Sequence, residues 1–168
     1  AWGLEVWRAP PTPEVVRASL GQYDTFYLAL DDLLDDLRET WGRFLVLDLH
    51  SYNHRRDGPH APAAAPAGNP QINVGTGTMQ DRGRWARLIE RFIAEMHAYE
   101  FPEGPLDVRE NVRFRGGNCA RWIHDRFPDS ACVLSIEVKK FFMDEWNADL
   151  NPVLLRAIGD ALRASIPG

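Results

Sequence analysis

The chain lacks any apolar run near the roughly 20 residues that a membrane-spanning helix needs, and it lacks the opening pattern of a secretory signal peptide. Basic residues are also few. Nineteen Lys and Arg against 24 Asp and Glu give a formal charge of −5, whereas nucleic-acid binders usually carry a basic excess. We therefore expect no membrane partner, no nucleic-acid partner and a cytoplasmic location.

Cysteine is scarce as well, since only Cys119 and Cys132 occur. Cys132 lies inside an apolar run, which favours a reduced core thiol over a disulfide framework. The chain opens Ala1-Trp2-Gly3 with no initiator methionine. We expect that this start is trimmed or lies inside a longer protein with further domains.

Apolar and aromatic residues, by contrast, are abundant. The 168 residues are 45% hydrophobic and include six Trp, eight Phe and four Tyr. This composition is typical of a globular chain, and this length suits one domain with its own core. We predict a single domain over residues 1–168.

The local patterns alternate between strands and helices. Thr12-Pro13 is a good helix start, and apolar residues then recur at helical spacing up to Trp41, where Gly42 ends the pattern. Further strands are expected at 4–7, 44–49, 69–74, 108–114 and 131–138, and further helices at 85–99, 118–127 and from 152. The apolar stripe of the last helix is Leu154, Leu155, Ile158, Ala161 and Leu162. This alternation predicts a three-layer α/β domain.

The segment from Phe44 onward is the most informative, because an apolar strand leads directly into Asp48, His50 and Ser51. Open α/β sheets bind ligands at the carboxyl ends of their strands. Asp48 and His50 are two residues apart, so their side chains leave the same face of the strand. A nearby carboxylate often supports a metal-binding histidine. The alternative is a strand whose polar end simply meets solvent.

A second apolar strand, 131–138, carries Glu137 near its end. An ionised carboxylate among apolar residues costs several kcal/mol unless it is paired, which favours a functional role. The alternative is a salt bridge with Lys139, Lys140 or an arginine.

The other residues of the types that bind metals are less informative. His54 would lie about 13 Å from His50 on a continuing strand, too far to share an ion unless a turn follows Ser51. We interpret His60 and His124 as incidental. The acidic run formed by Asp31, Asp32, Asp35 and Asp36 is interpreted as a solvated helix face.

Three motifs in order along the chain resemble the N-formylglutamate amidohydrolase family. They are Asp48-Leu49-His50-Ser51-Tyr52-Asn53, then Arg115-Gly116-Gly117, then the segment from Ser135 to Glu145. That family is similar to zinc carboxypeptidases and aspartoacylases. The resemblance implies a phosphorylase/hydrolase-like, three-layer α/β sandwich with a mixed, mostly parallel sheet.

The resemblance also implies roles for individual residues. His50 is the counterpart of a zinc ligand with Asp48 as its support, Glu137 is the counterpart of the water-activating carboxylate, and Gly116 and Gly117 lie near the substrate pocket. The family's other zinc ligands precede anything present here, since no Pro-His-Ser-Gly-like motif occurs before Asp48. The chain therefore resembles the carboxyl-terminal portion of such a domain. With one ligand of the usual three, it should hold zinc poorly.

The implied substrate is a small anionic N-formyl or other N-acyl amino acid such as N-formylglutamate. Arginine suits its carboxylates because the guanidinium binds them with two donors. The candidate substrate contacts flank the motifs and are Ser51, Asn53, Arg55, Arg56, Arg115, Asn118 and Arg121.

Two other functions stay open. The chain could be a metal-free, non-catalytic binding or regulatory module of a larger protein. It could also be a zinc carboxypeptidase-like peptidase, because the resemblance to carboxypeptidases extends to the metal and glutamate roles.

Overall fold

The computed structural model describes residue 5 and residues 7–166. Leu4 and Val6 of the extended segment expected at 4–7 lie outside the described residues. Internal contacts divide the chain into two compact units, Ala1–Arg43 and Phe44–Gly168. We describe each unit by itself.

The first unit contains one long helix, α1 (Pro13–Trp41). It begins where predicted, because the Thr12 hydroxyl accepts a hydrogen bond from the Val15 amide and Pro13 occupies the first turn. Gly42 ends it with a positive φ of 72°, and the Gly42 amide donates to the Arg38 carbonyl at 2.8 Å.

The second unit is built on a four-stranded sheet in the order β1-β4-β2-β3. The strands are β1 (Phe44–Tyr52), β2 (Ile72–Gly75), β3 (Val108–Glu110) and β4 (Ala131–Lys139). β1 runs parallel to β4 and β2 runs parallel to β3, while β4 and β2 are antiparallel. The predicted mixed, mostly parallel α/β sheet is therefore confirmed, with 131–138 as a central strand.

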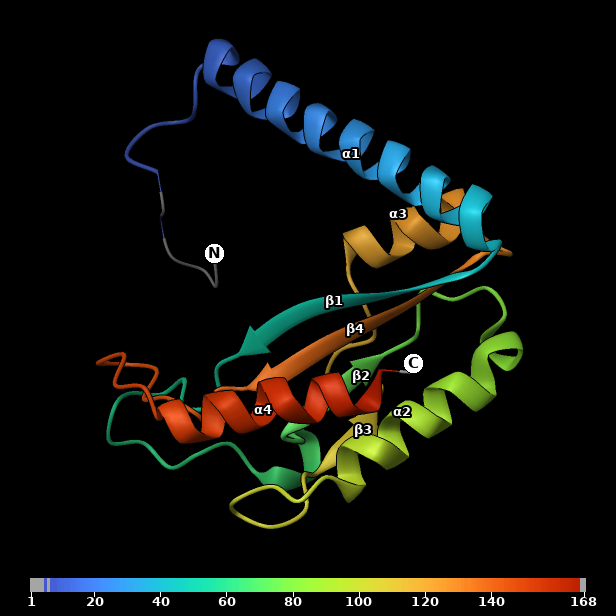
Figure 1. Ribbon diagram of the computed structural model, residues 1–168. Helices are drawn as coiled ribbons and strands as arrows, with labels where there is room; N and C mark the ends of the chain where they lie inside the picture. The colour runs from blue at the N-terminus through green and yellow to red at the C-terminus, as the bar shows by residue number, and fades with distance from the viewer. Residues whose placement is uncertain (1–4, 6, 167–168) are drawn as a thin grey trace. The chain divides into compact units, whose positions relative to one another are not determined.

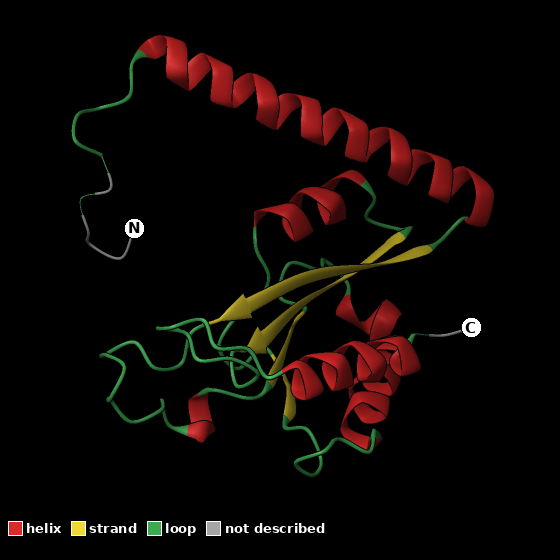
Figure 2. Cartoon of the chain, turned by 60° about the vertical axis from the view of Figure 1, so that its left-hand side comes forward, coloured by secondary structure: helices red, strands yellow, loops and turns green. Residues whose placement is uncertain are grey.

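Helices cover both faces of this sheet, as the two views agree (Figures 1 and 2). α3 (Asn118–Arg126) lies on one face, and α2 (Ala86–Ala98) and α4 (Pro152–Ser165) lie on the other. Two short 3-10 helices, Pro66–Gly68 and Arg82–Trp85, lie in the connections before β2 and α2. This is the three-layer arrangement that the alternation predicted.

The main core lies between the sheet and the α2/α4 layer. Alternate β4 residues Cys132, Leu134, Ile136 and Val138 belong to it and are buried. Because side chains alternate along a strand, Val133, Ser135 and Glu137 turn to the α3 face. The fold thus separates the apolar and polar halves of one strand.

Three local expectations need correction. β3 ends at Glu110 and not at 114, because Asn111 adopts a positive φ of 55° and the chain leaves the sheet. Leu155 is 43% exposed and does not join the buried stripe of α4. His124 is buried and holds structural hydrogen bonds, so it is not incidental.

No helix among the described residues combines the length and the apolar character needed to cross a membrane.

Candidate active site

The register between β1 and β4 brings the predicted residues together. Asp48 lies opposite Ser135, and His50 lies opposite Glu137. Neighbouring strands are about 4.8 Å apart, so these side chains stand beside one another on the α3 face. The two motifs, almost ninety residues apart in sequence, meet because their strands are parallel neighbours.

A short chain of hydrogen bonds orients the histidine. The His50 Nε2 and Asp48 Oδ1 atoms are 2.7 Å apart, and the Ser135 hydroxyl donates to Asp48 Oδ2 at 3.3 Å. The Asp48 side chain is 15% exposed, whereas that of His50 is 50% exposed. Asp48 is thus a fixed support, and His50 presents its ring to solvent.

Glu137 is half-buried beside this pair. Burial raises the pKa of its carboxyl, the nearby Asp48 charge raises it further, and His50 opposes both effects. No salt bridge to Glu137 is present among the described residues, so the alternative of a simple ion pair finds no support there. A carboxyl with a raised pKa, beside a site residue, is suited to accept and return a proton.

The predicted glycine pair lies close to this group. A side chain at Gly116, whose φ is 108°, would come within 3.4 Å of the Ser135 hydroxyl and 3.1 Å of the Thr78 methyl. Gly75 is equally restricted, because a Cβ there would lie 2.7 Å from the Gly116 amide nitrogen. These glycines let the 113–117 loop approach β2 and β4. Gly117 follows as the N-cap of α3.

Sequence reasoning missed Asn73, which lies opposite Glu137 on β2. Its fully buried amide accepts hydrogen bonds from the Arg113 and Phe114 backbone amides and donates to the Phe114 carbonyl at 2.8 Å. Asn73 therefore fixes the loop that carries Gly116. A buried asparagine inside an apolar strand was the available signal.

The predicted substrate contacts fall into three groups. Arg55, Arg115 and Arg121 are exposed, and the structure gives none of them a salt bridge among its described residues. Arg56 Nε donates to the Asn53 carbonyl at 3.3 Å, so those two hold one another. Ser51 lies opposite Val138, which places it on the other face of the sheet from His50.

The structure does not bring the other histidines to this site. β1 continues to Tyr52, and His54 beyond it packs with its Nδ1 3.4 Å from a Glu145 carboxylate oxygen. His60 is exposed in the loop after β1. His124 Nε2 accepts the Val133 amide, so its Nδ1 carries the proton and donates to the Thr78 hydroxyl at 2.9 Å. Burial lowers the pKa of His124 and of His54.

The donor set fits part of a zinc site. An exposed imidazole whose ring nitrogen bonds a carboxylate is the usual arrangement of a zinc-binding histidine. However, the described residues contain no cluster of three or more His, Cys, Asp or Glu side chains able to hold a metal. The part of the chain that the structure describes therefore fits one ligand and does not form a complete site.

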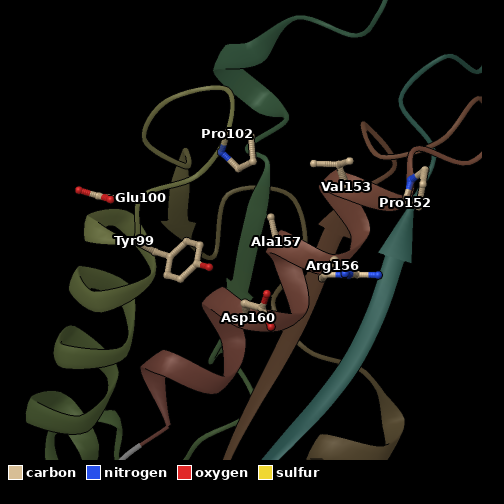
Figure 3. Close-up of a pocket in the computed structure, with 8 residues that line it drawn as sticks. All are labelled: Tyr99, Glu100, Pro102, Pro152, Val153, Arg156, Ala157 and Asp160. Carbon is tan, nitrogen blue, oxygen red and sulfur yellow. The ribbon is translucent and has the colours of Figure 1, made fainter.

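A separate hollow of about 340 Å³ lies at the end of α2 and the first half of α4. Figure 3 shows Tyr99, Pro102, Val153 and Ala157 around it. It carries no histidine and belongs to the helix layer on the opposite face of the sheet from His50. This hollow and the candidate chemistry are therefore in different places.

Comparison with known proteins agrees with this geometry. Residues 2–143 match the family model described as N-formylglutamate amidohydrolase. The crystal structure of N-formylglutamate amidohydrolase from Ralstonia eutropha JMP134, solved at 2.00 Å, superposes with a TM-score of 0.68 at 18% identity, covering 97% of this chain and 57% of that one. No match was found among curated proteins. The chain thus has the fold of that structure, spans little more than half of its length, and belongs to the N-formylglutamate amidohydrolase family.

Proposed function

We propose that this chain is part of an amidohydrolase that cleaves an N-formyl or other N-acyl amino acid such as N-formylglutamate. The observation that carries the proposal is the facing pair of strand ends, with the Asp48–His50 hydrogen bond on β1 and Glu137 directly opposite on β4. Family membership supports the same reaction class.

In the proposed reaction Glu137 manages the proton. Its carboxylate takes a proton from water as the water oxygen bonds to the acyl carbon. The same carboxyl then returns the proton to the nitrogen as the carbon–nitrogen bond breaks. The products are a carboxylic acid (formate for an N-formyl substrate) and a free amino acid.

We further propose that the complete enzyme uses zinc, with His50 as one ligand and Asp48 as the group that orients it. Zinc, when bound, would polarise the acyl oxygen and lower the pKa of a bound water. The other ligands would come from outside the described residues, because these contain no group of three. β1 supports this arrangement, since it pairs only with β4 and its outer edge is open within the described chain.

Substrate carboxylates would meet the exposed arginines that flank the site. Arg115 and Arg121 border Gly116 and Gly117, and Arg55 follows β1. Their guanidinium groups are not occupied by a carboxylate within the described residues, which leaves their donors available for an anionic ligand. The small anionic substrate and the cytoplasmic location both stay predictions.

The non-catalytic module is the second candidate, because the described residues lack a full ligand set. Formate release from N-formylglutamate, measured on the full chain with added zinc, separates the two. Hydrolysis that a chelator abolishes supports the amidohydrolase. No hydrolysis and no zinc binding support the module, and release of carboxyl-terminal residues from peptides alone would favour the peptidase.

A further inference from the structure

A buried carboxylate joins the two loops that follow the site-bearing strands. Glu145 lies in the loop after β4, and its side chain is 1% exposed. The His54 amide donates to its two oxygens at 3.0 and 3.1 Å, and the Arg55 amide also donates to Oε1. Both amides belong to the loop after β1, so the contact spans about ninety residues of sequence.

The loop that presents Glu145 is itself well braced. Met143 and Leu150 form an antiparallel bridge, and the Asp144 carboxylate accepts the Trp146 amide at 2.8 Å and the Asn147 amide at 3.1 Å. These contacts close a tight turn on either side of Glu145. The carboxylate is therefore held in place before it meets the other loop.

Two further hydrogen bonds join the end of β1 and the loop after it to the loop after β4. The Trp146 indole donates to the Arg55 carbonyl at 2.8 Å, and the Lys140 amide donates to the Tyr52 carbonyl at 3.0 Å. Arg55 thus has both its amide and its carbonyl fixed by neighbouring residues, Glu145 and Trp146. The backbone of the segment 53–56 is set by the β4 loop.

Burial of the Glu145 carboxylate destabilises the fold unless its hydrogen bonds are kept. A carboxylate removed from water loses its hydration, and hydrogen bonds to its charged form must offset that loss. Bonds from amides to a carboxylate are short and strong, and two consecutive amides make the contact directional. A surface ion pair would fix the loop far less.

We propose that Glu145 is a positioning residue that holds the 53–56 loop, which follows the strand that carries His50, so that Arg55 is fixed for an anionic substrate. This inference rests on the proposed function. It goes beyond it because a residue outside the site is given the role of holding the substrate-binding loop in place. Within the described residues Glu145 forms no hydrogen bond or ion pair with His50 or Glu137, so its removal should weaken binding of substrate more than the chemical step.

The test compares the full chain with its Glu145→Gln variant. Glutamine keeps the size but removes the charge and replaces one acceptor oxygen by a donor, so the hydrogen bonds from the His54 and Arg55 amides lose their charge assistance. Glu103→Gln is the matched control, because Glu103 is exposed and remote in sequence from either loop. Glu145→Asp keeps the charge on a shorter side chain and covers the case in which Glu145→Gln does not fold.

Two readouts are taken on each variant. In Glu145→Gln, hydrogen exchange of the His54 and Arg55 amides should rise about ten-fold or more, from the loss of charge-assisted bonds. KM for N-formylglutamate should rise about ten-fold with kcat within about three-fold, the pattern expected when binding alone is weakened. Glu145→Asp should be intermediate, and Glu103→Gln should match the unmodified chain.

Unchanged exchange of the two amides in Glu145→Gln would overturn the inference whatever the activity. An equal fall in kcat and kcat/KM would also overturn it, because Glu145 would then act on the chemical step. Absence of hydrolysis by the unmodified chain is a different failure, and it contradicts the proposed function.

Discussion

The two faces of β4 show how one strand serves two purposes. On the α2/α4 face, Leu134 and Ile136 are fully buried in the main core. On the α3 face, Ser135 bonds Asp48, and Glu137 stands opposite His50. The first set contributes to stability through area removed from water, and the second holds polar groups at some cost to stability.

The difference between the faces shows that the site depends on strand alternation and register. A one-residue slip between β1 and β4 would turn Asp48 and His50 away from Glu137. The buried face prevents that slip, because it would expose apolar residues such as Ile136. Core packing therefore fixes the geometry of the polar face, and the two faces should respond differently to substitution.

The largest expected effect is on activity, from Glu137→Gln. Loss of the proton acceptor should lower kcat by about two to four orders of magnitude, the usual contribution of a general base. The unfolding free energy of Glu137→Gln near pH 7 should equal or exceed that of the unmodified chain. Burial raises the folded pKa of Glu137 above its unfolded value, so its charged form weakens the fold as pH rises through the folded pKa. Formate release and urea unfolding give the two values, and retained kcat would contradict the assignment.

On the apolar face, Ile136→Ala should behave in the opposite way. Removing this fully buried side chain should lower the unfolding free energy by about 2–5 kcal/mol. Leu49 is its register partner on β1 and is 58% exposed, so Leu49→Ala should cost less than about 1 kcal/mol. Chemical denaturation measures both. Equal losses would show that the burial of Ile136 does not set the cost of its removal.

The support for His50 should have a moderate effect. Asp48→Asn removes the charged acceptor from His50 Nε2 and should weaken zinc binding about 10- to 100-fold. Competition with a chelator of known affinity measures the change. Asp57→Asn, in the exposed loop after β1, is the control and should leave zinc affinity unaltered.

The smallest expected effect is a pH dependence of stability from His124. Burial lowers its folded pKa below the unfolded value of about 6.5, so the neutral form stabilises the fold above that value. As pH falls below about 6.5, the unfolded chain takes up the proton first and stability declines. His124→Gln should reduce the pH dependence of the unfolding free energy between pH 5 and 7. His54 should account for the pH dependence that remains. An unchanged slope would show that His124 titrates equally in both states.

Much of the fold was predictable because its signals are local. The Thr12-Pro13 helix start and the apolar run 131–138 each depend on a few adjacent residues. The strand-end residues Asp48, His50 and Glu137 were identifiable because polar groups interrupt apolar strands. Leu155 was misplaced because its stripe was inferred from spacing alone, and α4 turns that side chain to solvent.

Features that depend on distant partners were not predictable. Asn73 holds the Arg113 and Phe114 amides across 40 and 41 residues, and Glu145 holds the loop after β1 across about ninety. The asparagine inside an apolar strand was a signal that Asn73 has a polar role, but its segment does not name its partners, and the segment around Glu145 gives no such signal. β3 ended early because Asn111 took a left-handed conformation that also serves Thr76, whose amide donates to the Asn111 side chain at 2.9 Å.

The most direct test of the account is zinc binding by the full chain and its His50→Ala variant, measured by calorimetry. We predict one weakly bound zinc per chain, lost in His50→Ala and kept in His60→Ala, which alters an exposed loop histidine. Zinc binding that His50→Ala leaves unchanged would contradict the assignment of His50 as a metal ligand.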